Sequence, residues 1–275
     1  MIINPFTPNP ALQPYILAYG YVEINEQIDS NNPIHIFPVD YTVMCFSLDE
    51  KKLIRELNTT NTFKNPLSYV GFLDRLRSFD SFTRKVVQVY FKPFGAYKLL
   101  GIPQHHFTNS ATDMEALFPA LKLTICQMRD EMKSPQKVIS ILESWLLQRL
   151  FLSEKICTAR VEYACDLIKA YAGNIHIAEL CREVAMSPTT LRDHFKEKIG
   201  FGPKTFGRIV RFSQLRRLLC ENACLKWTDL ADRFEFFDQT HFIKEFKHFY
   251  GCTPSQLHKM GQLNFTGKLT DSLDL

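Results

Sequence analysis

Hydrophobic positions between residues 175 and 200 follow the period of two short helices. Four of them recur at i, i+3, i+4 and i+7, the spacing of an apolar helix stripe: Ile177, Leu180, Cys181 and Val184. After a break, Ser187 offers an N-cap oxygen and Pro188 suits a first helical position. Met186 and Leu191 occupy the positions of a hydrophobic staple. The pattern predicts a second short helix that begins near Pro188.

The same pattern returns further along the chain. The motif Phe-Lys-x-x-x-Gly-x-x-Pro occupies residues 195–203 and, 51 residues later, residues 246–254. In the second copy, Thr228 and Asp238 are the expected caps of two helices. Its apolar positions are Leu230, Ala231, Phe234, Phe237, Phe242 and Phe246. Two short helices with a tight turn and a capped second helix predict a helix-turn-helix, so the chain holds two such units; a generic helical bundle is the plainer alternative.

Residues 203–220 connect the two units and predict one long helix. Apolar residues there alternate with four arginines: Arg208, Arg211, Arg216 and Arg217. A helix of this length spans about 27 Å, close to one DNA turn of about 34 Å. It could therefore hold two second helices on one face of a duplex, in two consecutive major grooves.

The first half of the chain has a different period. Residues 41–48 and 85–91 alternate and are rich in β-branched and aromatic residues, which predicts strands of a small sandwich or barrel. The apolar spacing over 121–132 and 138–146 then predicts two helices joined near Ser134-Pro135. This helical pair could dimerise the protein or pack on its own barrel.

Charge separates the two halves. Residues 1–154 hold 15 Lys and Arg against 15 Asp and Glu, whereas residues 155–260 hold 17 against 12. The whole chain carries +4, so the excess positive charge lies where the repeat lies. Charge alone fits a solvated surface equally well, but together with the repeat it favours nucleic acid as the partner.

Other features narrow the class of protein. The amino terminus resembles no signal peptide and no long apolar run follows, so we expect a cytoplasmic protein that does not enter a membrane. The eight cysteines form no Cys-x-x-Cys pair, which predicts reduced core thiols. Neither a catalytic triad order nor a nucleotide fingerprint occurs. We therefore predict no metal, no cofactor and no enzymatic activity.

At this point a family resemblance becomes specific. Residues 161–260 resemble the DNA-binding domain of the AraC/XylS family of bacterial regulators, most closely over 230–254, with Asp-Gln-Thr-His-Phe at 238–242. The resemblance implies seven helices, two helix-turn-helix units and a linker helix. The family usually has glycine in both turns, where this chain has Ala185 and Glu235. If the same backbone is kept, such a replacement costs on the order of 1 kcal/mol.

The resemblance also implies which side chains face DNA. Arg192 can donate two hydrogen bonds to guanine, and Asp193 can accept from cytosine or orient Arg192. Gln239 suits adenine and Lys244 suits guanine or phosphate, whereas Lys247 fits a backbone contact. The predicted DNA-contacting residues are Thr189, Thr190, Arg192, Asp193, Gln239, Thr240 and Lys244.

The amino-terminal half carries a shorter resemblance. Phe-x-Pro-x-Gly-Ala at residues 91–96 is similar to a stretch of the cupin-like domain found in some AraC-type regulators, which implies a jelly-roll sensor. Cupin enzymes hold a metal with a His-x-His pair. Here His35 is isolated, and His105 and His106 are adjacent and so would lie on opposite faces of a strand. We read these histidines as structural or surface residues.

Together these observations predict an α+β protein. Residues 1–153 form a cupin-like sensor or dimerisation domain, 154–260 a double helix-turn-helix domain and 261–275 a tail. The predicted function is sequence-specific transcription regulation on double-stranded DNA, controlled by a small-molecule effector or by homodimerisation, with RNA polymerase as a further candidate partner. Two alternatives remain: a jelly-roll enzyme with an appended DNA-binding domain, and a helix-turn-helix interaction module that no longer binds DNA.

Overall fold

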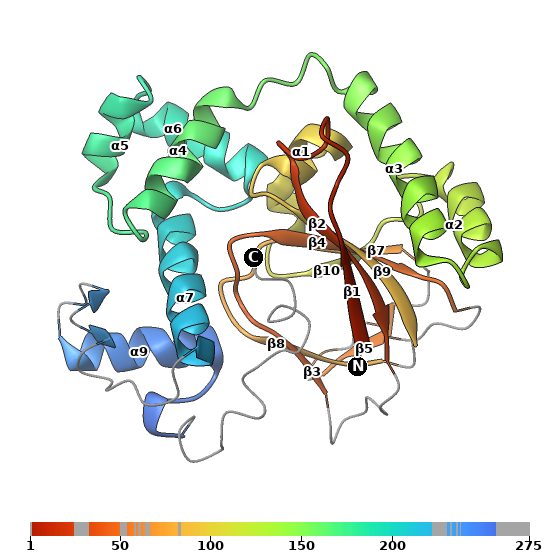
Figure 1. Ribbon diagram of the computed structural model, residues 1–275. Coiled ribbons are helices and arrows are strands. Elements are labelled where there is room, and N and C mark those ends of the chain that lie inside the picture. Colours follow the sequence, from red (N-terminus) through yellow and green to blue (C-terminus); the bar gives the residue numbers. More distant parts are fainter. Residues whose placement is uncertain are drawn as a thin grey trace.

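Strands fill the first half of the protein and helices the second (Figure 1). Thr228, Glu235 and the predicted tail at 261–275 lie outside the part of the chain that the computed structural model describes. The described residues are 2–24, 33–49, 54–57, 59, 62–63, 67–81, 84–221, 230–231, 233–234, 236 and 238–256.

The larger sheet has six antiparallel strands in the order β1-β2-β9-β4-β7-β10. Its central strand β9 is buried almost throughout, because alternate side chains enter different packed regions: Val87 and Val89 face the helices, and Tyr90 faces the second sheet. The strands are β1 (Ile2–Phe6), β2 (Ile16–Glu23), β9 (Lys85–Phe91), β4 (Thr42–Ser47), β7 (Leu67–Val70) and β10 (Ala111–Asp113). The predictions of strands at 41–48 and 85–91 are confirmed as β4 and β9.

A smaller antiparallel sheet has the order β3-β8-β5-β6. Its strands are β3 (Ile34–Ile36), β8 (Arg77–Ser81), β5 (Ile54–Glu56) and β6 (Thr62–Phe63). Two antiparallel sheets followed by a helical region confirm the predicted α+β class.

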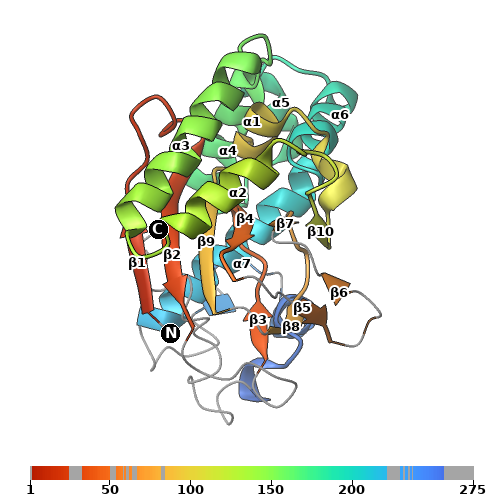
Figure 2. The same cartoon turned by 90° about the vertical axis from the view of Figure 1, so that its right-hand side faces the viewer.

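Four helical segments follow the strand β9 or lie near it: α1 (Gly95–Leu100), the 3₁₀ helix η1 (Gln104–Phe107), α2 (Leu121–Asp130) and α3 (Pro135–Leu152). Figure 2 shows α2 and α3 lying across the six-stranded sheet. The Tyr21 hydroxyl donates to the carbonyl of Met132 at 2.7 Å, and Glu143 accepts from the backbone of Asn9 at 2.6 Å. The predicted helical pair therefore packs on its own barrel.

The carboxy-terminal helices form two groups joined by α7 (Figure 1). One group contains α4 (Ala159–Ala170), α5 (Ile177–Glu183) and α6 (Pro188–Lys198), and α9 (Gln239–Tyr250) lies at the other end of α7 (Pro203–Glu221). The expected linker helix at 203–220 is thus confirmed. Phe212 of α7 stacks on Phe249 of α9, with ring centroids 4.2 Å apart, and this contact fixes α9 against the linker.

The two halves of the protein share one buried hydrophobic cluster. Phe72 meets Phe206 of α7 edge to face at 5.5 Å between ring centroids, and Phe37 meets Tyr250 of α9 at 5.7 Å. Phe94 lies in the same cluster as the helical residues. The helix α3 ends at Leu152 and α4 begins at Ala159, so the segment between them connects the two halves. Residues from both sides of this connection pack in the same hydrophobic cluster.

Candidate nucleic-acid interface

The first helix-turn-helix has the predicted cap and staple. Ser187 Oγ accepts from the backbone N–H of Thr190 at 3.1 Å, and Met186 and Leu191 are both buried. The turn ends α5 with a hydrogen bond from Met186 N–H to the Cys181 carbonyl at 3.0 Å, the pattern of a Schellman motif. Ala185 stands at its left-handed position with φ +50°, so the chain keeps the backbone that glycine would favour.

The outer face of α6 is polar. Thr189, Thr190, Arg192 and Asp193 are all exposed, whereas Leu191 is fully buried. Arg192 Nε lies 3.4 Å from Asp193 Oδ1, and both side chains are more than half exposed at 66% and 61%. The pair therefore remains free to exchange this weak contact for a partner in solution.

The helix α9 repeats this arrangement. Asp238 caps it by accepting from the His241 N–H at 2.6 Å. Phe242 is buried, whereas the three predicted contact residues of this helix are exposed: Gln239, Thr240 and Lys244. The Phe236 N–H bonds the Ala231 carbonyl at 3.0 Å, with the same five-residue spacing as Cys181 and Met186 in the first unit. The internal repeat is thus visible in the backbone hydrogen bonds as well as in the sequence.

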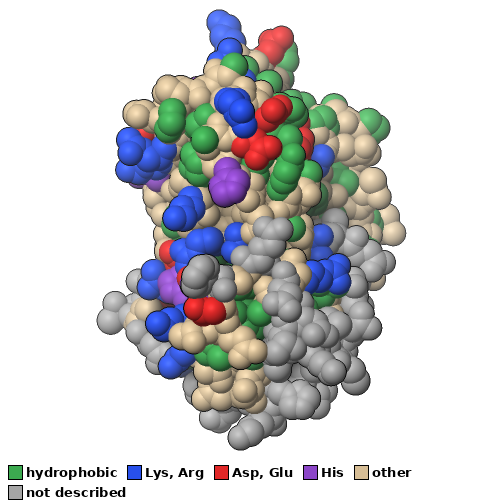
Figure 3. All heavy atoms as spheres, turned by 90° about the vertical axis from the view of Figure 1, so that its left-hand side faces the viewer, with side chains coloured by type: hydrophobic (Ala, Val, Ile, Leu, Met, Phe, Trp, Pro, Cys, Tyr) green, Lys and Arg blue, Asp and Glu red, His purple; other side chains and the backbone are tan. Residues whose placement is uncertain are grey.

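A cleft of about 580 Å³ separates the two units. Its walls are the turn before α5, the amino-terminal half of α7 and the inner side of α9, and its basic side chains are His176, Lys204, Arg208, Arg211 and His241. Figure 3 shows Lys, Arg and His side chains along this face of the molecule, several of them midway between its upper and lower parts. The sequence pattern predicted α7 as a long connecting helix and indicated no cleft beside it. Arg208 and Arg211 follow Lys204 by four and seven residues, a spacing that was the available signal that these three cations share one helix face.

Fixed contacts shape this cleft. Glu245 accepts two hydrogen bonds from the Arg208 guanidinium, at 2.7 and 2.8 Å, and so ties α9 to α7. At the floor, a Cβ on Gly173 would lie 2.1 Å from the carbonyl oxygen of Gly207. Because Gly173 also has φ +83°, the turn before α5 can approach α7 only with glycine at this position.

The amino-terminal half contacts the first helix-turn-helix unit and the linker helix through polar groups. Asp40 accepts from Ser213 of α7 at 2.9 Å and pairs with Arg217 of α7 at 3.1 Å and Lys169 of α4 at 2.8 Å. Burial pushes the pKa of Asp40 upward, but these cations and hydrogen bonds outweigh it and hold the pKa below its usual value. Tyr97 donates to Glu197 of α6 at 2.7 Å. The β-rich half is thereby attached to α6 and to the linker helix α7.

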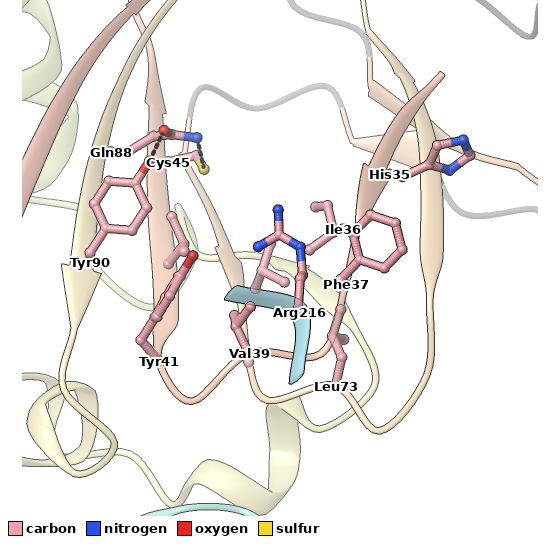
Figure 4. A pocket seen from close by; sticks show the side chains of 13 residues that line it. His35, Ile36, Phe37, Val39, Tyr41, Cys45, Leu73, Gln88, Tyr90 and Arg216 are labelled. Atoms are coloured by element: carbon pink, nitrogen blue, oxygen red, sulfur yellow. Dashed lines mark hydrogen bonds between the residues drawn. The ribbon is translucent and has the colours of Figure 1, made fainter. Parts of the chain in front are cut away.

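A cavity of about 80 Å³ lies between the two sheets. Its walls come from β3 and the segment after it, from β4, β7 and β9, and from Arg216 of α7 (Figure 4). His35 is at its edge, and its Nδ1 lies 2.8 Å from Ser78 Oγ. Burial lowers the pKa of His35, which favours the neutral ring.

His105 and His106 lie at the surface, in agreement with their reading as structural or surface residues. They belong to the 3₁₀ helix η1 and are both exposed, with ring centroids 4.2 Å apart. The alternation of side chains along extended chain does not apply to them, since the local backbone is helical. Among the described residues no group of three His, Cys, Asp or Glu side chains is placed to hold a metal ion. No described helix is long and apolar enough to cross a membrane.

Two protein families match parts of the chain. Residues 180–260 match a family described as a helix-turn-helix domain, and residues 4–113 match a domain of unknown function, DUF6597. The first match covers both α6 and α9, and the second covers the end of β1 and all the later strands.

Similar proteins include operon regulatory proteins of other bacteria. The arabinose operon regulatory protein of Salmonella typhimurium is 28% identical over 124 residues, which are 43% of this chain and 44% of that protein. A probable thc operon regulatory protein of Rhodococcus erythropolis is 27% identical over 111 residues, or 39% of this chain and 33% of that protein. The matched region thus spans less than half the length of these relatives.

Among solved structures, ToxT from Vibrio cholerae O395 aligns with 88% of this chain and 96% of its own length. The sequence identity is 14% and the TM-score 0.44.

Proposed function

The chain is a member of the AraC family through its carboxy-terminal helix-turn-helix domain, and on this premise we propose that it regulates transcription by reading two consecutive major grooves of double-stranded DNA. The observation that supports this reading is the pair of capped helices α6 and α9, each with a buried hydrophobic face and an exposed polar face. One linker helix joins them within a single protomer.

In this proposal each recognition helix has its own base-reading side chains. Arg192 donates to guanine O6 and N7, with Asp193 orienting it or accepting from cytosine. Gln239 pairs with adenine, and Lys244 contacts guanine or phosphate. Thr189, Thr190 and Thr240 complete the contact surface. All seven side chains are exposed, as this role requires.

The basic cleft has a separate role in the proposal. Lys204 is exposed and Arg208 is about one-third exposed, and both face the space between the two units. The DNA backbone that connects two neighbouring major grooves would pass this space. We assign these cations to phosphate contacts, which position the duplex without reading its sequence.

The amino-terminal half has a regulatory role in the proposal. We propose residues 1–153 as the regulatory domain and 154–260 as the DNA-binding domain, because polar contacts such as Asp40–Ser213 would transmit a change in one to the other. An effector, a second copy of the chain and RNA polymerase are the proposed partners besides DNA. The exposed apolar side chains of Leu123, Phe151 and Leu152 offer a surface for a second copy. A regulator is preferred over an enzyme because the relatives are regulators, and the cytosol is its proposed compartment because the operator is there.

Selection from random duplex DNA tests the proposal directly. The full chain should enrich one sequence motif with two parts about 10 base pairs apart. Its affinity in gel shifts should fall steeply with salt, with log K against log salt sloping about −5 to −6 if five to seven phosphates are contacted. Absence of any enriched motif, with flat salt dependence, would leave the interaction-module alternative.

A further inference from the structure

The helix α9 leaves one large hydrophobic side chain in contact with solvent. Its phenylalanines and its tyrosine are buried: Phe242, Phe246, Phe249 and Tyr250. Ile243, by contrast, is 42% exposed. Exposure alone assigns no role, because single apolar side chains are common at protein surfaces. The neighbours of Ile243 and its place in the internal repeat indicate what this side chain contacts.

Ile243 lies within the polar face that is proposed to enter the major groove. Gln239 precedes it by four residues and Thr240 by three, and Lys247 follows it by four. Side chains at these spacings are neighbours on a helix surface, and all of these are exposed. Ile243 thus stands between two proposed DNA-contacting residues of the groove face and a proposed backbone contact.

The internal repeat gives Ile243 a counterpart in the first unit. The caps Ser187 and Asp238 lie 51 residues apart, and each accepts from the backbone N–H three residues later. In both helices a buried residue follows four positions after the cap. With this register, Ile243 occupies the position that Arg192, the proposed reader of guanine, has in α6.

An isoleucine recognises a base differently from an arginine. It has no hydrogen-bond donor or acceptor, so it cannot pair with the polar edge of guanine, adenine or cytosine. The apolar group that a base presents in the major groove is the C5 methyl of thymine. A β-branched side chain in a helix also has one strongly preferred χ1 rotamer, so it loses little freedom when it packs against that methyl. The chemistry of this position therefore changes from guanine in the first unit to thymine in the second.

We propose that Ile243 selects a thymine by packing against its C5 methyl. This inference rests on the proposed function and adds a specificity-determining contact to it. Gln239, one turn earlier on the same face, suits adenine, so the half of the site under α9 is expected to be rich in A·T pairs. Arg192 gives the other half a guanine. Because the two halves differ, the site has a direction and the bound protein has one orientation on it.

Deoxyuridine tests the methyl contact, because it differs from thymidine only by the missing C5 methyl. The motif selected by the full chain is synthesised with each thymine replaced in turn, and affinities are measured in gel shifts. In the half of the motif that Gln239→Ala alters, one replacement should weaken binding about threefold to fivefold, the effect of one buried methyl. Absence of thymine from that half, or equal affinity for all the uracil duplexes, would contradict this inference alone.

Variants assign the effect to Ile243. In Ile243→Ala the difference between the thymine and uracil duplexes should fall below about twofold, because the shorter side chain removes most of the apolar contact. Ile243→Val keeps a branched side chain and should retain most of the difference. Lys247→Ala is the matched control on the same face: it should weaken both duplexes by the same factor, so that the difference persists. An undiminished difference in Ile243→Ala would assign the methyl contact to another side chain and refute the proposal.

Exchange of the paired positions tests the specificity. Ile243→Arg should change the selected base from thymine to guanine at one position, and Arg192→Ile should change guanine to thymine in the other half. Both side chains are exposed, so neither exchange alters the core. A thymine retained by Ile243→Arg would overturn the proposal. A parent chain that enriches no motif at all would contradict the proposed function itself, and this inference with it.

Discussion

At the scale of single residues, the exposed faces of α6 and α9 separate base readers from backbone contacts. Arg192→Ala and Gln239→Ala should each relax base preference at a few positions by about 1–3 kcal/mol. Each substitution removes a side chain that can form two hydrogen bonds with one base. Lys247 lies on the exposed side of α9, and Lys247→Ala should weaken binding to all DNA sequences alike. Selection from random DNA with each variant measures this, and motifs identical to the parent for both readers would mean that other side chains read the bases.

Ala185 makes a second prediction at this scale. Because it holds φ +50°, Ala185→Gly removes a left-handed strain of about 1 kcal/mol and should raise the midpoint of unfolding in urea. Ala178→Gly is the matched control: Ala178 is exposed inside α5, where glycine costs about 0.5–1 kcal/mol. Equal losses in the two variants would argue against strain at Ala185.

At the scale of elements, one glycine sets the contact between the α4–α5 turn and α7. Gly173→Ala places a Cβ 2.1 Å from the Gly207 carbonyl oxygen at positive φ, and overpacking should cost about 1–3 kcal/mol or more. Gly202→Ala serves as control, because the nearest atom to its Cβ is Arg192 Cγ at 3.9 Å. Thermal unfolding of the full chain should separate them, and a Gly173→Ala protein as stable as Gly202→Ala would contradict this packing.

At the scale of the whole molecule, one protomer should cover two grooves. Since α7 joins both units in one chain, hydroxyl-radical footprinting should reveal two protected patches about 10 base pairs apart on one face. Sedimentation of the complex gives its stoichiometry. A single patch would mean that only one unit binds DNA. Glu235→Gly, which introduces the glycine that the family usually has in this turn, would then test whether the second turn is the cause.

The contacts of Asp40 predict how acid affects the attachment of the two halves. Its pKa is lowered in the folded protein, so its stabilisation is fully present above the unfolded pKa of about 3.9 and is lost as pH falls through the lower folded value. Asp40→Asn should cost about 1–3 kcal/mol near neutral pH and remove this acid dependence. Asp74→Asn, in the exposed pair with Arg75, should change little. Stability curves from pH 7 to pH 3 compare them; superimposable curves for Asp40→Asn and the parent would refute the role of Asp40.

Local rules account for most of what was predictable. Caps such as Ser187, the apolar stripes and the repeat at 195–203 and 246–254 act within a few residues, so they could be read without knowing the fold. The two histidines of η1 are exposed, in agreement with their reading as structural or surface residues, but the 3₁₀ turn that holds them was not predicted.

The sequence by itself determined two helix-turn-helix units, the long linker, the α+β class and the exposed side chains that could read DNA. Only the tertiary structure decided that Phe37 and Phe72 share a core with the helices, that Asp40 meets Ser213, and that Arg216 enters a cavity between strands. Periodicity fixes which face of a helix is apolar, but not which distant surface covers that face. Such contacts join residues more than a hundred positions apart, and they depend on how whole layers pack.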